Sequence, residues 1–406
     1  SETGQRRYVP VGHALRWMAH DPSNELLAFY RLNRAQDYEE FQAALRLYDS
    51  PAQNFVYADA RKNIALHCTG RVPLRWPDQS RYLLDGSDPR ADWQGYIPRE
   101  HLPRVKNPAR GFVSSANQYP VDSTYPYPWP GFYASFERGR RINRRLDSLQ
   151  SVTVDSLRRL QLDDLHLLAK AVLPALLKQT RREPLEPELL AWLRQLEGWN
   201  LRNEARSTAA TRFHLWWHFI ETGIWDDDFP PPDFPRPDAA RTALLIRKDT
   251  ASRWYDDRRT PERERLPQVL ARALAQARDS LRRFSADSSR WAWGRFKGSH
   301  IPHLTRSASL RSFGRFDLEL GGGRDQVNAM DITHGPSWRM VVSLGPYVRG
   351  YGIYPGGQSG HPASRWYDAF VDRWAAGELD EQLLLNQPAA SESRLLVGEL
   401  LARPGP

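Results

Sequence analysis

The sequence has a single cysteine, Cys68, and no run of apolar residues long enough to cross a membrane. One thiol cannot form an intrachain disulfide framework, and it cannot supply a cysteine-based zinc site. A membrane-spanning helix needs about 20 mostly apolar residues, so no such span is expected. Lysine is also scarce, and almost all of the positive charge therefore comes from arginine.

What the sequence does have is length and aromatic content. Its 406 residues are enough for a large hydrophobic core, and aromatic residues, including 15 tryptophans, make up 11% of the chain. Disordered chains are poor in aromatic residues, so the composition indicates a folded protein. The net charge of +9 would suit a nucleic-acid-binding protein. We do not favour that class, because the arginines are scattered and no recognition helix, zinc finger or RNA-binding sheet is visible.

The hydrophobic periodicity predicts mixed structure first, then helices, then strands. Short helices at 25–34 and 41–48 precede a hairpin of strands at 54–58 and 64–68. Residues 76–130 are rich in proline, glycine and aromatics, which predicts long ordered loops with one short strand at 111–114. Later helices are predicted at 154–162, 165–178, 187–196, 208–224 and 261–284. Later strands are predicted at 316–320, 327–332 and 338–344, before a closing helix at 361–376.

This order of elements predicts an α+β fold with a helical insertion. A sheet and loop region is expected at 1–132, an inserted helical lobe at 133–290, and C-terminal strands with the closing helix at 291–406.

Three local patterns could carry chemistry, and none of them is specific. His300 and His303 have a spacing that metal ligands use, but Pro302 disfavours a helix there and no further ligand type clusters nearby, so no metal site is expected. The glycine run 321–323 lacks the Gly-Lys-Ser/Thr of a phosphate-binding loop, so a turn between strands is expected. Ser1 could act as a nucleophile whose own α-amine takes the hydroxyl proton.

A series of segments along nearly the whole chain resembles one enzyme family. It includes Ala14-Leu15-Arg16-Trp17, Asn54-Phe55-Val56-Tyr57-Ala58-Asp59, Gly95-Tyr96-Ile97-Pro98, Gly111-Phe112-Val113, Ala116-Asn117, Trp293-Gly294 and Pro355-Gly356-Gly357-Gln358-Ser359-Gly360-His361-Pro362. In these segments the chain is similar to the penicillin amidase (penicillin acylase) family of N-terminal-nucleophile hydrolases. No single motif is decisive, but so many motifs in the family's order are specific.

The resemblance implies antiparallel sheets between helical layers, here incomplete and with a large inserted helical lobe. It implies an amidohydrolase that cleaves the amide of an N-acylated small molecule, of the β-lactam or acyl-homoserine lactone class. The family's precursor cuts itself into two chains, and the serine that begins the second chain forms the acyl-enzyme. Family members in double-membrane bacteria are usually periplasmic, so a periplasmic or secreted location is expected.

The resemblance also assigns two site residues. Asn117 matches the family's oxyanion-hole asparagine, whose side-chain amide donates to the oxygen that gains charge in the tetrahedral intermediate. Arg141, directly before Ile142, best matches the arginine that supports this asparagine, and Arg138, one turn earlier, is the second choice.

The start of the chain departs from the family pattern. Glu2-Thr3-Gly4 does not match the residues that follow the family's nucleophile, and the segment at Ala14 comes too soon after Ser1. We therefore expect the nucleophile to be missing from this chain and supplied by an N-terminal segment or α chain of the same precursor. No cofactor is needed for the chemistry. The family's structural calcium is not expected, because no acid stands in 125–130, where the calcium-binding aspartate would fall.

Together these points predict the C-terminal majority of a penicillin-acylase-type enzyme, inactive when alone. The alternative is a non-catalytic remnant of such an enzyme that binds an acyl ligand or a partner chain.

Overall fold

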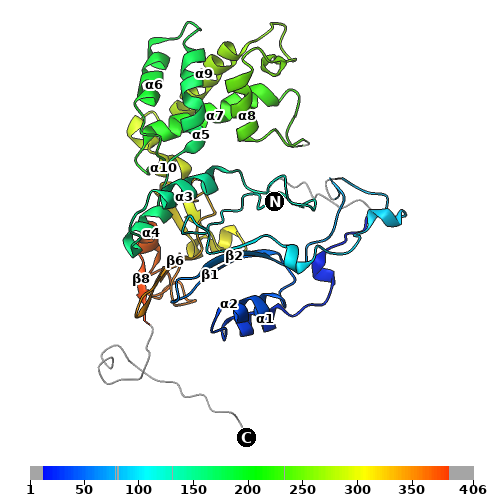
Figure 1. The fold of residues 1–406 in the computed structure, drawn as a ribbon. Coiled ribbons are helices and arrows are strands. Elements are labelled where there is room, and N and C mark those ends of the chain that lie inside the picture. Colours follow the sequence, from blue (N-terminus) through cyan, green and yellow to red (C-terminus); the bar gives the residue numbers. More distant parts are fainter. Residues whose placement is uncertain (1–11, 78, 80–81, 130, 233, 384–406) are drawn as a thin grey trace. The chain divides into compact units, whose positions relative to one another are not determined.

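The computed structural model describes residues 12–77, 79, 82–129, 131–232 and 234–383 (Figure 1). The chain forms two compact units, residues 1–139 and 140–406. Both contain helices and antiparallel sheets, which confirms the predicted α+β class. The three-part division stays a prediction; the helical block and the strands after it belong to the same compact unit. Within the described residues, no helix is long and apolar enough to span a membrane.

The first unit packs helices against a small sheet. Its main elements are α1 (Glu25–Leu32), α2 (Tyr38–Leu45), β1 (Gln53–Ala58), β2 (Ile64–Thr69) and β3 (Arg104–Lys106). The antiparallel strands lie in the order β1-β2-β3, and the predicted hairpin of β1 and β2 is confirmed. Tyr38, Phe41 and Leu45 of α2 are buried with Ala65 of β2, so the apolar side of α2 covers one face of this sheet. The side chains of β2 alternate, and the buried set on this strand is Ala65, His67 and Thr69.

The second unit begins within α3 (Glu137–Asp147), which starts in the first unit. Its helices are α4 (Val154–Gln161), α5 (Leu167–Thr180), α6 (Pro187–Glu197), α7 (Thr208–Trp225), α8 (Ala239–Lys248), α9 (Leu266–Phe284), α10 (Trp293–Lys297) and α11 (Val371–Ala375). Its strands form two antiparallel sheets: β4 (Ser299–Ile301) with β5 (Arg315–Leu318), and β6 (Arg339–Leu344), β7 (Val348–Ile353) and β8 (Asp380–Gln382). Figure 1 shows α5 to α9 gathered in one bundle. The largest core cluster lies here, and Trp216 of α7 is fully buried in it.

Several predicted elements are wrong in extent or type. Residues 111–114 and 327–332 form no strand. In the second segment one carbonyl, that of Ile332, accepts from the His300 N–H of β4, but the Asn328 N–H donates to the Asp163 carbonyl, so no continuous ladder forms. The closing helix is only α11, since Gly360, His361 and Pro362 lie in a loop. α9 begins at Leu266 rather than at Pro261, and it uses Pro267 in its first turn.

A pair of histidines is buried in the helical core of the second unit. The rings of His166, at the start of α5, and His214, of α7, lie 5.0 Å apart between centroids. His214 stacks on Trp293 at 4.1 Å, and its Nε2 lies 3.0 Å from the amide nitrogen of Asn203. Burial lowers the pKa of His166 to about 3. Burial, together with the charges of His166 and Lys297, lowers the pKa of His214 well below its ordinary value.

These histidines predict that mild acid destabilises the protein. In the unfolded chain both rings take up a proton near pH 6.5, whereas the folded protein keeps them neutral. Burial of the two rings therefore does not lower stability above about pH 6.5, and below it the free energy of unfolding decreases by ~1.4 kcal/mol per pH unit for each ring that stays neutral in the folded protein. Urea unfolding followed by tryptophan fluorescence at pH 7.5, 6 and 5 measures this slope. The double variant His166→Asn, His214→Asn should flatten the slope, and an unchanged slope would contradict the assignment.

Candidate active site

Asn117 lies in the loop between β3 and α3, within the first compact unit. Its φ angle of 62° lies in the left-handed region, which asparagine adopts more easily than most residues. Its backbone carbonyl accepts a hydrogen bond from the Ala134 N–H at 2.9 Å. The Oε1 of Gln118 accepts a hydrogen bond from the Ala116 N–H at 2.7 Å. These two bonds fix the backbone on either side of the Asn117 side chain.

The side-chain amide of Asn117 is oriented by one arginine. Arg138, in the first turn of α3, donates from its NH2 nitrogen to Asn117 Oδ1 at 2.8 Å. The oxygen end of the amide is therefore occupied, and no described residue accepts a hydrogen bond from Asn117 Nδ2. An amide held in this way presents its N–H groups as donors, which is the chemistry of an oxyanion hole.

A cavity of about 280 Å³ adjoins this amide; we call it the Asn117 cavity. Its lining residues come from β1, β2 and the loop before α3: Ala52, Gln53, Asn54, Cys68, Thr69, Val72, Asn117, Gln118, Pro120, Trp129, Phe132 and Tyr133. Trp129 donates a hydrogen bond from its ring N–H to the Tyr133 hydroxyl, and the Tyr133 ring meets Tyr119 edge-on at 5.2 Å. An aromatic wall of this kind can cover an apolar group of a bound molecule while the amide of Asn117 contacts a polar one.

Cys68 lines the Asn117 cavity but is not poised to act as its nucleophile. Burial raises the pKa of the Cys68 thiol to about 11, so the group stays protonated at neutral pH. The thiolate is the reactive form of cysteine, and no charged partner in the described residues opposes the effect of burial. Ser1, the other candidate nucleophile, lies outside the described residues.

Arg141 occupies a different place from Arg138. Its Nε donates to Asp163 Oδ1 at 2.9 Å and its NH2 nitrogen donates to Oδ2, which makes a two-pronged ion pair inside the second unit. The Asp163 side chain is only 6% exposed. Burial alone would raise the pKa of this carboxyl, but the bonds from Arg141 and from the Leu165 N–H outweigh it, so the pKa lies below its ordinary value. Arg141 therefore neutralises a buried acid, whereas Arg138, the second choice from the sequence, contacts Asn117.

The remaining candidates form no further site. His300 Nδ1 lies against the Gly298 carbonyl and His303 Nδ1 against the Thr305 hydroxyl, and no group of three or more metal-ligating side chains occurs among the described residues. The glycine run at 321–323 does not cradle an anion, because two of its N–H groups already donate to the backbone carbonyls of residues 203 and 328.

One positioning residue was missed by the sequence reasoning. Asn54 of β1 donates from Nδ2 to the Ser115 hydroxyl at 2.7 Å, which ties the loop of Asn117 to the sheet. Asn54 belongs to a family-like segment, but nothing in that segment indicates a contact with a loop far along the chain. The choice between Arg138 and Arg141 could not be made from the sequence either, because both lie near the start of the same helix.

The chain is similar to several known proteins. The penicillin amidase family matches residues 3–390. The acyl-homoserine lactone acylase QuiP of Pseudomonas putida is 27% identical over 408 residues, which cover 92% of this chain and 49% of that protein. Penicillin G acylase of Escherichia coli is 28% identical over 222 residues, which cover 51% of this chain and 25% of that protein. The chain thus spans about half the length of the first of these relatives.

A solved structure has the same fold. The thermostable penicillin G acylase from Alcaligenes faecalis superimposes with a TM-score of 0.64 at 16% sequence identity, over 94% of this chain and 73% of that chain. The predicted fold of the N-terminal-nucleophile hydrolases is therefore confirmed.

Proposed function

This chain belongs to the penicillin amidase family, and we propose that it forms the oxyanion-stabilising part of an acylase. The substrate is an N-acylated small molecule, and the reaction is hydrolysis of its amide through an acyl-enzyme. The observation that carries the proposal is the Asn117 amide, whose oxygen accepts from Arg138 while its nitrogen remains available beside a cavity.

The proposed mechanism assigns each described residue a limited role. A serine hydroxyl attacks the amide carbonyl, and the carbonyl oxygen gains negative charge in the tetrahedral intermediate. Asn117 Nδ2–H donates to this oxygen, both when the acyl-enzyme forms and when water later hydrolyses it. Arg138 holds the amide of Asn117 in the donating orientation and places positive charge close by. In this proposal Arg141, predicted from the sequence for the second role, stabilises the fold through Asp163 instead.

The attacking serine is proposed to come from polypeptide other than these 406 residues, an N-terminal segment or α chain of the same self-processed precursor. Support for this comes from coverage, because the match spans only 49% of the acyl-homoserine lactone acylase QuiP of Pseudomonas putida. Relatives named for acyl-homoserine lactones and for penicillin favour these two substrate classes. The aromatic wall of the Asn117 cavity suits an apolar part of either. By the same family argument we propose a periplasmic or secreted location.

Reconstitution tests the proposal. We expect no release of the acyl group from an N-acyl-homoserine lactone or a phenylacetyl anilide by the purified 406-residue chain. We expect turnover when the chain is co-expressed with the missing part of a family precursor, which includes the nucleophilic serine. Turnover by the chain alone would contradict the external nucleophile. Binding of the substrate without turnover in both samples would favour the non-catalytic alternative.

A further inference from the structure

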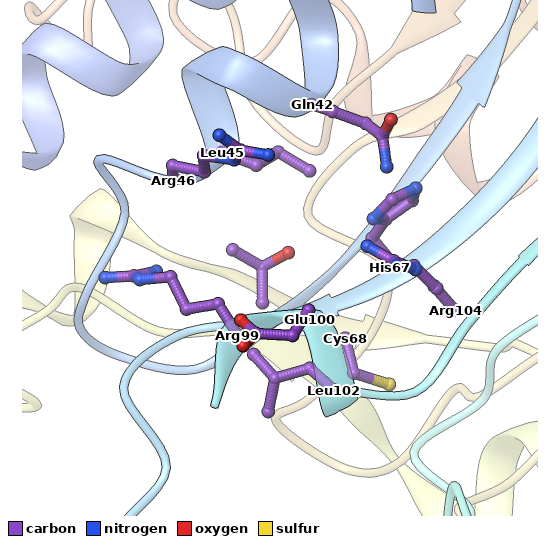
Figure 2. A pocket seen from close by; sticks show the side chains of 10 residues that line it. Gln42, Leu45, Arg46, His67, Cys68, Arg99, Glu100, Leu102 and Arg104 are labelled. Atoms are coloured by element: carbon purple, nitrogen blue, oxygen red, sulfur yellow. The ribbon is translucent and has the colours of Figure 1, made fainter. Parts of the chain in front are cut away.

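A second and larger cavity lies in the first unit, and nothing in the proposed reaction uses it. Its volume is about 560 Å³, within the range of small-molecule sites. Figure 2 shows its lining side chains, which come from α2 and the residue after it, from β2, and from residues 99–104 up to the start of β3: Gln42, Leu45, Arg46, His67, Cys68, Thr69, Arg99, Glu100, Leu102 and Arg104. We call it the basic cavity, since three of these residues are arginines and only one is an acid.

The three arginines differ in how their charge is used. Arg99 donates to the Asp49 carboxylate and to the Tyr48 carbonyl, so its charge is already neutralised and its guanidinium is fixed in the wall. The guanidinium groups of Arg46 and Arg104 have no ion pair or hydrogen bond to any described residue. Figure 2 shows Arg46 next to Leu45 and Arg104 next to His67. Two guanidinium groups with open donors therefore border one cavity.

The rest of the lining adds no positive charge. The Tyr38 hydroxyl lies 2.8 Å from His67 Nε2, and the ring is buried. Burial, and to a lesser extent the charge of Arg104, lowers the pKa of His67, so this ring is neutral at pH 7. Buried Thr69 adds a hydroxyl. Leu45 and Leu102 supply an apolar part of the wall.

The charges of the basic cavity select a single negative charge. Arg46 and Arg104 contribute two positive charges, and the Glu100 carboxylate offsets one of them, so one net positive charge remains. A guanidinium pairs well with a planar carboxylate through parallel N–H···O bonds. A dianionic phosphate would exceed the remaining positive charge and be repelled by Glu100.

We propose that the basic cavity binds a small organic molecule that carries one carboxylate. The carboxylate contacts Arg46 and Arg104, and the apolar part of the molecule lies against Leu45 and Leu102. The site is distinct from the Asn117 cavity, with which it shares only Cys68 and Thr69 as lining residues. It does not depend on the proposed amide hydrolysis.

Calorimetric titration of the 406-residue chain tests this site, with hexanoate as the probe. Hexanamide is a neutral molecule of the same shape, and inorganic phosphate is the dianionic comparison. We expect hexanoate to bind, hexanamide to bind at least about tenfold more weakly, and added salt to weaken hexanoate binding. Equal affinity for hexanoate and hexanamide, or tighter binding of phosphate, would overturn the proposal.

Variants locate the binding. Arg46→Gln and Arg104→Gln should each weaken hexanoate binding by about tenfold or more, because each removes a charged donor. Arg31→Gln removes the same charge from exposed α1 and should leave the affinity unchanged. Phe132→Ala alters only the Asn117 cavity and should also leave the affinity for hexanoate unchanged. If Phe132→Ala weakens binding while the variants at 46 and 104 do not, hexanoate occupies the other cavity and the inference is wrong. Both arginines are exposed, so circular dichroism should show all four variants folded.

Discussion

Replacing Asn117 with aspartate is expected to lower kcat of the reconstituted acylase by about 10²–10³, the loss seen when one oxyanion-hole donor is removed. Aspartate has the same size as asparagine and can still accept from Arg138, but it has no N–H to give to the oxyanion. It would also place a negative charge where the reacting oxygen becomes negative. Steady-state hydrolysis of an N-acyl-homoserine lactone by the co-expressed chains measures the effect.

Two further variants separate this role from packing. Asn117→Gly permits the left-handed backbone without a donor and should lose as much activity. Asn33→Ala, an exposed asparagine at the end of α1, should change neither rate nor stability. Activity that survives in Asn117→Asp but not in Asn117→Gly would mean that only the shape of the side chain matters, and Asn117 would not be an oxyanion donor.

Arg138 and Arg141 of α3 should respond differently to substitution by alanine. Arg138→Ala should lower kcat less than the Asn117 variants do, with partial recovery in Arg138→Lys, because it orients the donor and does not replace it. Arg141→Ala should leave kcat nearly unchanged but lower the free energy of unfolding by about 3 kcal/mol, since it strands the buried Asp163 carboxylate. A large loss of kcat in Arg141→Ala with normal stability would restore Arg141 to the site.

Gly322→Ala is expected to lower the free energy of unfolding by about 3 kcal/mol, through a left-handed backbone and a steric clash. Gly322 has a φ angle of 73°, and a Cβ there would lie 2.2 Å from the backbone oxygen of Asn328. The backbone at Gly322 cannot move away from this clash without losing hydrogen bonds. Its carbonyl accepts from the Trp293 ring N–H at 2.7 Å, and its N–H donates to the Asn203 carbonyl. Chemical denaturation measures the loss.

The matched control for this substitution is Gly345→Ala, in the turn between β6 and β7. The nearest atom to a Cβ at Gly345 lies 3.7 Å away, and its φ angle is not in the left-handed region. Its stability should change little. Equal effects at the two glycines would mean that the close approach at Gly322 does not constrain the fold.

The helices α4 to α7 could be predicted closely because their apolar periodicity is a local property. Local caps support them: Thr153 receives the N–H of Ser156 at the start of α4, and Ser207 receives the N–H of Ala210 at the start of α7. The strand predicted at 327–332 has a suitable composition, but the Asn328 N–H donates to the Asp163 carbonyl rather than to a neighbouring strand. Which distant group pairs with a given backbone N–H is decided by the tertiary structure, and the sequence of the segment does not contain it.

The candidate site shows the same limit. Asn117 could be selected because its flanking residues resemble a family motif, and the structure gives it an arginine partner and a cavity. The sequence could not show which arginine contacts Asn117, since Arg138 and Arg141 lie one turn apart on the same helix. The deciding quantity is the distance between side chains, which is 2.8 Å for the Arg138 nitrogen and Asn117 Oδ1.

Cys68 and Thr69 of β2 belong to the walls of both cavities, so a single strand separates them. Any attempt to evolve a new substrate preference through these two positions will change both compartments at once. Asn54 and Phe132 line the Asn117 cavity alone, and Gln42 and Arg46 line the basic cavity alone. A mutant library that leaves residues 68 and 69 unchanged can therefore alter the ligand preference of each cavity independently.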